Sequence, residues 1–224
     1  MATPTLIFDM DGVLVDSEPI ANTVFADHLG RFGVSMTVDE VIAQFRGLRL
    51  DDCVAWVQTT YDITLPADFI ETLQVETFQR LEAALQPIPN VESALSQLSY
   101  PMCLASSSAP DKIALSLRVT GLGRYFPPER RFSGTQVPRG KPDPALFRLA
   151  ASTVGADPRD CLVIEDSVAG VQAARRAGMA ALGYAPNNHN QEGLVKAGAI
   201  VYSDMCSLPA MIAGVWANVL FARG

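Results

Sequence analysis

Four carboxylates follow two apolar stretches of the chain, and their types and spacing suit chemistry. Asp9 and Asp11 come directly after the first apolar stretch, and Gly12 follows them. Glu165 and Asp166 end a later apolar stretch in the same way. Residues two apart in a strand face the same side, so Asp9 and Asp11 start on one side of the chain. Buried like charges are costly unless a cation offsets them.

These acids predict a magnesium site, because hard oxygen ligands without histidine or cysteine favour Mg²⁺. The two histidines, His28 and His189, stand in a helical pattern and in a loop, and both are poor ligand candidates. The cysteines are far apart and contain no CxxC pair, which argues against structural zinc and predicts reduced, buried thiols. They are Cys53, Cys103, Cys161 and Cys206.

Two further motifs offer groups that bind an anion. In LASSSAPDKIAL, Ser106 ends an apolar stretch and Ser107 follows it. A helix that begins after these serines would present free N–H groups and its positive dipole end to a phosphate. Ser108 and Asp111 also have the spacing of a capping box, and that interpretation stays open beside the functional one. Lys141 in GKPDPALF lies where a turn leads into a helix, and its charge would balance the acids.

The elements that must position these residues alternate along the chain. Short apolar stretches alternate with helical patterns that end at a glycine, which predicts an α/β fold. The expected architecture is a Rossmann-like core whose parallel sheet is covered by helices on both faces. Ligands of such sheets bind at the carboxyl ends of the strands, where the candidate residues stand. Strands are expected within 5–10, 101–108, 161–167, 179–184 and 198–204.

One long segment breaks the alternation. Residues 17–86 show four helical patterns and no convincing strand. We interpret them as an α-helical bundle, inserted as a cap over the strand ends. The predicted domains are therefore an α/β core of residues 1–16 and 87–224, and a helical cap domain of residues 17–86.

Charge and hydropathy exclude several classes of function. The 17 basic and 24 acidic residues give a net charge of −7, and no basic run could neutralise a nucleic acid backbone. The amino-terminal segment MATPT lacks the basic residues of a signal peptide. The apolar segment MIAGVWANVLFA is too short to span a bilayer. We expect a cytoplasmic protein with no nucleic acid partner, no membrane contact and no evident obligate protein partner.

The motifs DMDGVLVDS, SSS, GKPDP and EDS, in that order, resemble the haloacid dehalogenase (HAD) superfamily of phosphohydrolases. The resemblance is to the subclass that carries a helical cap after its first strand, and it covers nearly the whole chain. It implies a phosphoric monoester hydrolase that depends on Mg²⁺ and works through an aspartyl-phosphate intermediate. The expected partner is a small phosphorylated metabolite.

The same resemblance implies a role for each candidate residue. Asp9 would be the nucleophile, and Asp11 would protonate the leaving oxygen and later activate water. The implied magnesium ligands are the Asp9 carboxylate, the Asp11 backbone carbonyl, Asp166, and Glu165 directly or through water. The implied phosphoryl-binding groups are Ser106, the Ser107 N–H and Lys141.

The predicted cap offers candidates for substrate recognition. Arg46 and Arg49 lie in a loop between predicted cap helices. They are either solvated surface arginines, or one of them grips the carboxylate, hydroxyls or second phosphate of the substrate when the cap closes. Glu18, beside the hinge that joins the predicted cap to the core, would touch the leaving group. The motifs FRGLRL, RFSG and GKPDPALF are similar to those of bacterial enzymes that act on sugar or sugar-acid phosphates, including a 6-phosphogluconate phosphatase.

Two other functions fit part of the pattern. A phosphomutase of the β-phosphoglucomutase type shares the fold, but Ala21 occupies the position where those enzymes carry a hinge histidine. A dehalogenase of the same fold lacks the second aspartate, so Asp11 argues against it. A phospho-accepting signalling module also uses strand-end acids, a lysine and Mg²⁺. That module is about half as long and has no helical insertion.

Overall fold

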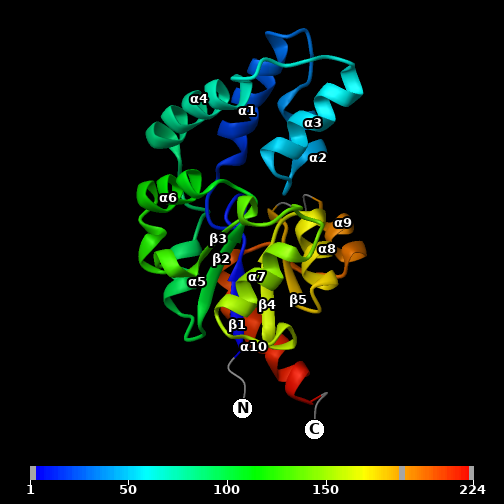
Figure 1. Cartoon of the computed structure of the whole chain (residues 1–224). Helices are drawn as coiled ribbons and strands as arrows, with labels where there is room; N and C mark the ends of the chain where they lie inside the picture. Colours follow the sequence, from blue (N-terminus) through cyan, green and yellow to red (C-terminus); the bar gives the residue numbers. More distant parts are fainter. Residues whose placement is uncertain (1–3, 187–189, 222–224) are drawn as a thin grey trace.

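The computed structural model describes residues 4–186 and 190–221, so His189 lies outside the described residues. Its sheet has six parallel strands in the order β3-β2-β1-β4-β5-β6 (Figure 1). This order confirms the predicted Rossmann-like core. The strands are β1 (Thr5–Phe8), β2 (Met102–Ser106), β3 (Arg131–Ser133), β4 (Cys161–Glu165), β5 (Ala180–Tyr184) and β6 (Ile200–Tyr202).

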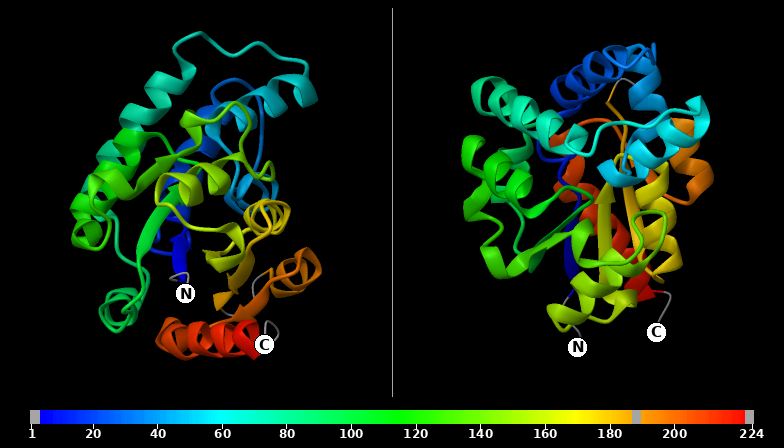
Figure 2. Two further views of the ribbon diagram at one scale, coloured as in Figure 1. Left: turned by 60° about the horizontal axis from the view of Figure 1, so that its bottom comes forward. Right: turned by 45° about the horizontal axis from the view of Figure 1, so that its top comes forward.

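Helices cover both faces of the sheet, because its strands are apolar on both sides. Leu6 and Phe8 of β1 point into one apolar cluster with helices α5, α6 and α10, whereas Ile7 points into a second cluster with α7, α8 and α9. Figure 2 shows these two helical layers from further directions. The helices are α5 (Val91–Ser96), α6 (Pro110–Val119), α7 (Ala145–Thr153), α8 (Val168–Arg176), α9 (Gln191–Ala197) and α10 (Leu208–Phe221).

Four helices follow β1 and lie beyond the carboxyl ends of the strands (Figure 1). They pack around an apolar cluster of their own, with Phe25, Phe45 and Phe69 among its members. They match the four helical patterns expected after the first strand. The domain boundaries at 16/17 and 86/87 stay a prediction. The helices are α1 (Glu18–Gly30), α2 (Val38–Phe45), α3 (Leu50–Tyr61) and α4 (Phe69–Ala84).

The two chain segments that connect these four helices to the sheet run side by side. The Asp16 N–H donates to the Gln86 carbonyl at 2.9 Å, and the Ile88 N–H donates to the Leu14 carbonyl at 2.9 Å. Val15 also bridges to Pro87 between them. The start and the end of the helical segment are therefore joined by backbone hydrogen bonds.

Two features differ from the sequence-based expectations. Strand β3 was not expected, since it has only three residues and begins with the charged Arg131. All four cysteines are free, but Cys206 is exposed, so the expectation of four buried thiols is wrong for this one. Single-turn 3₁₀ helices complete the connections: η1 (Leu122–Arg124), η2 (Pro128–Arg130), η3 (Gly134–Gln136), η4 (Pro158–Asp160) and η6 (Met205–Ser207).

Helix α10 carries much of the apolar segment near the carboxyl terminus. Its buried residues, which include Leu208 and Ile212, pack into the cluster beneath β1. Across the described ranges, no helix combines the length and the apolar character needed to cross a membrane.

Candidate active site

Three neighbouring strands end at the same edge of the sheet and bring the predicted residues together. Phe8 of β1 is in register with Leu104 of β2 and Ile164 of β4. The Asp9 N–H then donates to the Ile164 carbonyl at 2.9 Å, which fixes Asp9 beside the end of β4. Residues that follow these three strands therefore meet in one place, as the sequence predicted.

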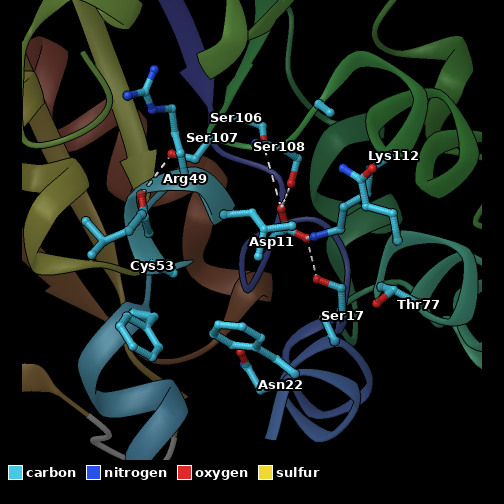
Figure 3. Close-up of a pocket in the computed structure, with 18 of the residues that line it drawn as sticks. Asp11, Ser17, Asn22, Arg49, Cys53, Thr77, Ser106, Ser107, Ser108 and Lys112 are labelled. Carbon is cyan, nitrogen blue, oxygen red and sulfur yellow. Dashed lines mark hydrogen bonds and ion pairs between the residues drawn. The ribbon is translucent and has the colours of Figure 1, made fainter. Parts of the chain in front are cut away.

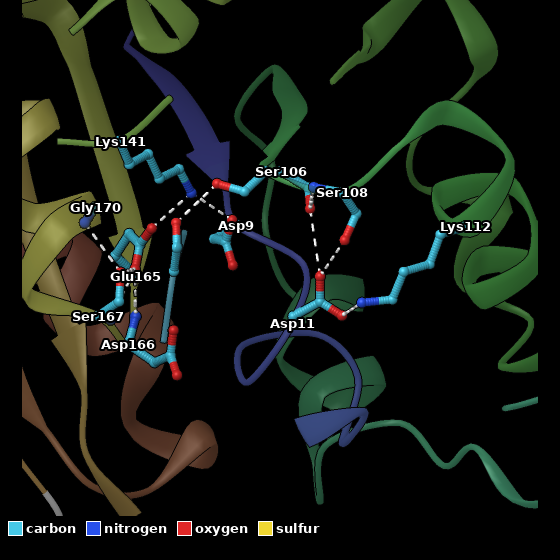
Figure 4. A network of polar contacts seen from close by, with 12 residues as sticks. Asp9, Asp11, Ser106, Ser108, Lys112, Lys141, Glu165, Asp166, Ser167 and Gly170 are labelled. Atoms are coloured by element: carbon cyan, nitrogen blue, oxygen red, sulfur yellow. Dashed lines mark hydrogen bonds and ion pairs between the residues drawn. The ribbon is translucent and has the colours of Figure 1, made fainter. Parts of the chain in front are cut away.

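Lys141 lies in the middle of this edge and is fully buried. Its Nζ donates to Asp9 Oδ1 at 2.5 Å and to Glu165 Oε1 at 2.7 Å, as Figure 4 shows. Burial alone would lower the pKa of Lys141, but Asp9 and Glu165 outweigh burial and raise that pKa above its ordinary value. Lys141 is therefore a permanent cation that holds two strand-end carboxylates together.

The acids around Lys141 are crowded and buried. Burial, reinforced by Glu165 and Asp11, raises the pKa of Asp9 to about 7, against the opposing charge of Lys141. Burial and the nearby Glu18 and Glu165 raise the pKa of Asp166 well above its usual value. One oxygen each from Asp9, Glu165 and Asp166 lie within 4.8 Å of one another. A cation placed among these oxygens would relieve their repulsion.

Gly12 allows Asp166 to approach the Asp9–Asp11 turn. Its φ is +79°, a conformation that L side chains rarely adopt, and a Cβ there would lie 2.3 Å from Asp166 Oδ2. The contact of this glycine with the second acid pair is not visible in the sequence. The residue serves both backbone conformation and space for a carboxylate.

Glu165 organises the turn after β4. Its Oε2 accepts hydrogen bonds from the Asp166 N–H at 2.9 Å, the Ser167 N–H at 2.8 Å and the Ser167 hydroxyl at 2.8 Å. Ser167 also accepts from the Gly170 N–H at 3.0 Å, so it caps α8. Both Glu165 oxygens therefore already accept hydrogen bonds, Oε1 from Lys141 and Oε2 from the turn after β4.

The serine loop after β2 contacts Asp11 rather than capping a helix. Ser108 donates from its hydroxyl to Asp11 Oδ2 at 2.7 Å, and the Ser106 hydroxyl lies 3.4 Å from the same oxygen. Helix α6 begins at Pro110 with no side-chain cap, so the capping box between Ser108 and Asp111 is wrong. The Ser108 hydroxyl instead donates its hydrogen bond to Asp11, almost 100 positions earlier in the chain.

Lys112 is a site residue that was not predicted from the sequence. It stands in the first turn of α6, and its Nζ donates to Asp11 Oδ1 at 2.8 Å (Figure 4). The Ser17 hydroxyl donates to the same oxygen. Burial would raise the pKa of Asp11, but Lys112 and the hydroxyls of Ser17 and Ser108 hold it below its usual value. Lys112 follows the last of the three serines by four residues, which is about one helical turn. This spacing indicates a position near Asp11 only once the start of α6 is known.

A cavity of about 220 Å³ opens between this edge and the four helices (Figure 3). Asp9, Asp11 and the three serines line its floor. Its other wall mixes phenyl rings with polar side chains from α1 and α4, including Asn22 and Gln74. Ala21 also lines this wall and offers no group for proton transfer at the position of the mutase histidine.

Arg46 and Glu18 lie together at this cavity. One guanidinium nitrogen of Arg46 donates to Glu18 Oε2 at 2.7 Å, and another lies 3.7 Å from Asp166 Oδ2. Burial raises the pKa of Glu18, against the charge of Arg46. Arg46 is thus an ion-paired arginine that reaches the second acid pair and is no isolated surface residue.

Arg49 has its guanidinium engaged by other groups. It forms a two-point ion pair with Asp52, at 2.9 and 3.0 Å. It also lies 3.2 Å from the Val137 carbonyl and 3.5 Å from the Gly134 carbonyl of the sheet-bearing part. Arg49 therefore joins the helical segment to the rest of the molecule in this structure.

Ser107 makes a second contact of the same kind. Its hydroxyl donates to the Gly47 carbonyl, in the loop of Arg46 and Arg49, at 2.8 Å. The arginine loop thus rests on the serine loop, and both border the cavity.

Residues 3–178 match the sequence profile of the haloacid dehalogenase-like hydrolases. The match covers the whole edge described above. The chain belongs to this family.

Relatives of this hydrolase include phosphatases of small phosphorylated compounds. It is 30% identical over 207 residues to the 6-phosphogluconate phosphatase of Escherichia coli, covering 92% of this chain and 93% of that protein. It is also 30% identical over 184 residues to a fructose-1-phosphate phosphatase of the same organism, covering 79% and 94%. Through its family and these relatives, the hydrolase is identified as a phosphomonoester hydrolase.

Solved structures share the whole architecture. A haloacid dehalogenase-like protein from Agrobacterium tumefaciens is 35% identical, with a TM-score of 0.80 over 95% of this chain and 99% of that one. A HAD family hydrolase from Deinococcus radiodurans, solved with bound phosphate and sodium, is 30% identical, with a TM-score of 0.72 over 97% of both chains. These likenesses confirm the predicted fold class.

Proposed function

We propose that this hydrolase is a Mg²⁺-dependent phosphatase of a small sugar or sugar-acid phosphate, and that it acts through an aspartyl-phosphate on Asp9. The observation that carries the proposal is the buried cluster of Asp9, Lys141, Glu165 and Asp166 at the floor of the cavity. An oxygen nucleophile, a fixed cation and a set of hard oxygen ligands are the groups that phosphoryl transfer requires.

The residues of this cluster suit a magnesium ion. Asp9, Asp166 and the Asp11 backbone carbonyl would hold it, and Glu165 would contribute directly or through water. The raised pKa values of Asp9 and Asp166 support this assignment, because a divalent cation favours their ionised forms. When bound, the ion would neutralise charge on the phosphoryl oxygens.

The other groups divide the remaining work. Asp9 would attack phosphorus, while Ser106, the Ser107 N–H and Lys141 stabilise the phosphoryl oxygens. Asp11 would take up a proton from solvent as it leaves Lys112, give it to the leaving oxygen and later take one from water. Its hydrogen bonds to Ser17, Ser108 and Lys112 hold it beside the cavity, from which it would turn toward Asp9.

The residues that border the cavity from the helical segment would select the substrate. Glu18, Arg46 and Arg49 are the candidates named from the sequence. Since Arg49 is held by Asp52 and by two backbone carbonyls, we propose that it holds the helical segment against the sheet-bearing part rather than gripping the substrate. Arg46 pairs with Glu18 and lies near Asp166, so these two side chains would contact the leaving group.

A panel of small phosphomonoesters, assayed for phosphate release with Mg²⁺ and with EDTA, tests the function. We expect release that requires Mg²⁺ and falls by at least about a thousandfold in Asp9→Asn, with an unchanged circular dichroism spectrum. A matched control is Asp16→Asn, which makes the same change outside the cluster. Near-native turnover in Asp9→Asn, or turnover in EDTA, would refute the mechanism.

A further inference from the structure

Lys112 is the starting point, because the proposed function gives its ammonium group no part beyond holding Asp11. It is the third residue of α6, its side chain is 19% exposed, and it lines the cavity. Its Nζ lies 2.8 Å from Asp11 Oδ1. The ammonium group thus stands at the floor of the cavity, on the side of Asp11 that faces α4 (Figure 3).

Within the described chain, the Lys112 side chain makes fewer polar contacts than either arginine side chain of the cavity. Arg46 is paired with Glu18 and lies near Asp166, and Arg49 is committed to Asp52 and two carbonyls. An ammonium group has three N–H donors, and within the described chain Lys112 uses one of them, on Asp11. Of the cavity cations in the described residues, Lys112 is the one best able to accept an anionic ligand.

The partner of Lys112 connects ligand binding to Asp11. Both Asp11 oxygens are occupied, one by Lys112 and Ser17 and the other by Ser108. These contacts keep the carboxylate on the α6 side of the cavity, while Asp9 lies with Lys141 on the other side (Figure 4). An anion that draws the Lys112 ammonium away would remove the charged contact and loosen the hold on Asp11.

The surrounding wall suits a ligand with hydroxyl groups. Asn22, Gln74 and Thr77 line the same cavity, and within the described chain their side chains make no hydrogen bond. Amide and hydroxyl groups of this kind can donate to and accept from the hydroxyls of a polyol chain. Figure 3 shows Thr77 on the same side of Asp11 as Lys112.

We propose that Lys112 is a specificity residue that recognises a second acidic group, a carboxylate or a phosphate, on the leaving part of the substrate. Lys112 exchanges Asp11 for that group, so recognition of the acidic end also frees Asp11. This inference rests on the proposed function, since it concerns the leaving group of the same site. It assigns to Lys112 the anion-binding role that the sequence suggested for one of Arg46 and Arg49.

Two matched substrate pairs test the proposal in turnover. The carboxylate pair is 6-phosphogluconate and glucitol 6-phosphate, which differ at one end carbon. The phosphate pair is fructose 1,6-bisphosphate and fructose 6-phosphate. We expect wild-type kcat/KM to favour the acidic member of one pair by about tenfold or more. Lys112→Met should bring that ratio near one, mainly through KM, and Lys112→Arg should restore most of it.

The control substitution is Lys196→Met, the same chemical change on an exposed lysine paired with Glu192. It should keep the wild-type ratio. The pair in which Lys112→Met abolishes the preference identifies the anion as a carboxylate or a phosphate. A wild type without preference in either pair, or an unchanged ratio in Lys112→Met, would overturn the proposal.

A binding measurement separates this inference from the proposed function. Calorimetry on Asp9→Asn, with and without Lys112→Met, gives the affinity ratio for each pair without turnover. A tenfold ratio that depends on Lys112 supports the inference even where no phosphate is released. A ratio near one in both proteins overturns it even where the phosphatase is active.

Discussion

Gly12→Ala provides the sharpest test of how the two acid pairs depend on each other. The new Cβ would lie 2.3 Å from Asp166 Oδ2 and 2.7 Å from Asp166 Cγ, so the carboxylate must move. The backbone φ of +79° adds a strain of about 1–2 kcal/mol for a residue with a Cβ. We therefore expect two separable effects, one on stability and one on the proposed magnesium site.

Gly33→Ala is a matched control, because Gly33 has the same φ of +79° and no atom within 4 Å of a Cβ placed there. Urea unfolding should show a loss of about 1–2 kcal/mol in this control, from backbone strain alone. Gly12→Ala should lose at least as much. Subtracting the control then leaves the cost of displacing Asp166.

The second effect is read from Mg²⁺ titrations of phosphatase activity. Displacement of a proposed ligand should raise the half-saturating Mg²⁺ concentration of Gly12→Ala by about tenfold or more. Gly33→Ala should match the wild type, since Gly33 is not among the residues that line the cavity. Equal Mg²⁺ requirements in both variants would refute the inference that Gly12 makes room for a metal-binding Asp166.

Two further predictions concern buried and partly buried charge. Lys141→Met should destabilise the protein by about 3 kcal/mol in urea unfolding with EDTA, because Asp9 and Glu165 lose their shared cation. With Mg²⁺ the loss of stability should be smaller, because a bound ion would replace the missing charge. Equal losses under both conditions would count against a cation site there. His28, Arg80 and Arg31 hold the pKa of Glu76 at about 2, below its ordinary 4.5. The lowered pKa means that ionised Glu76 stabilises the fold above about pH 4.5, and this stabilisation is lost as pH falls toward 2. Glu76→Gln should therefore reduce the change in unfolding free energy over that pH range by about 1 kcal/mol in urea titrations. An unchanged profile would contradict this.

The strand-end acids were predictable because their signal is local. Asp9 and Asp11 directly follow an apolar strand, and Glu165 and Asp166 do the same, so strand register alone brings them together. Lys141 was predictable from its motif, although its burial beneath Asp9 was not. In each case neighbouring residues in the sequence set the position.

The rest of the site depends on contacts between distant segments. Lys112 has the pattern of a solvated helix residue until the fold places Asp11 against the first turn of α6. The same contact takes the Ser108 hydroxyl and removes the predicted capping box. Arg49 could not be assigned because its partners include a local acid, Asp52, and carbonyls more than 80 positions away. No pattern along the chain distinguishes such a tether from a substrate contact.

The hydrogen bonds between residues 14–16 and 86–88 have a consequence for how this architecture tolerates change. Because the first and last residues of the helical segment are hydrogen-bonded to each other, the segment constrains the sheet no more than a short connecting loop would. Lengthening, shortening or replacing the helical segment should leave the strand alignment intact, because the entropy cost of closing a loop grows only slowly with its length. The helices that border the cavity can thus change, and with them the substrate, while the residues at the strand ends stay in place.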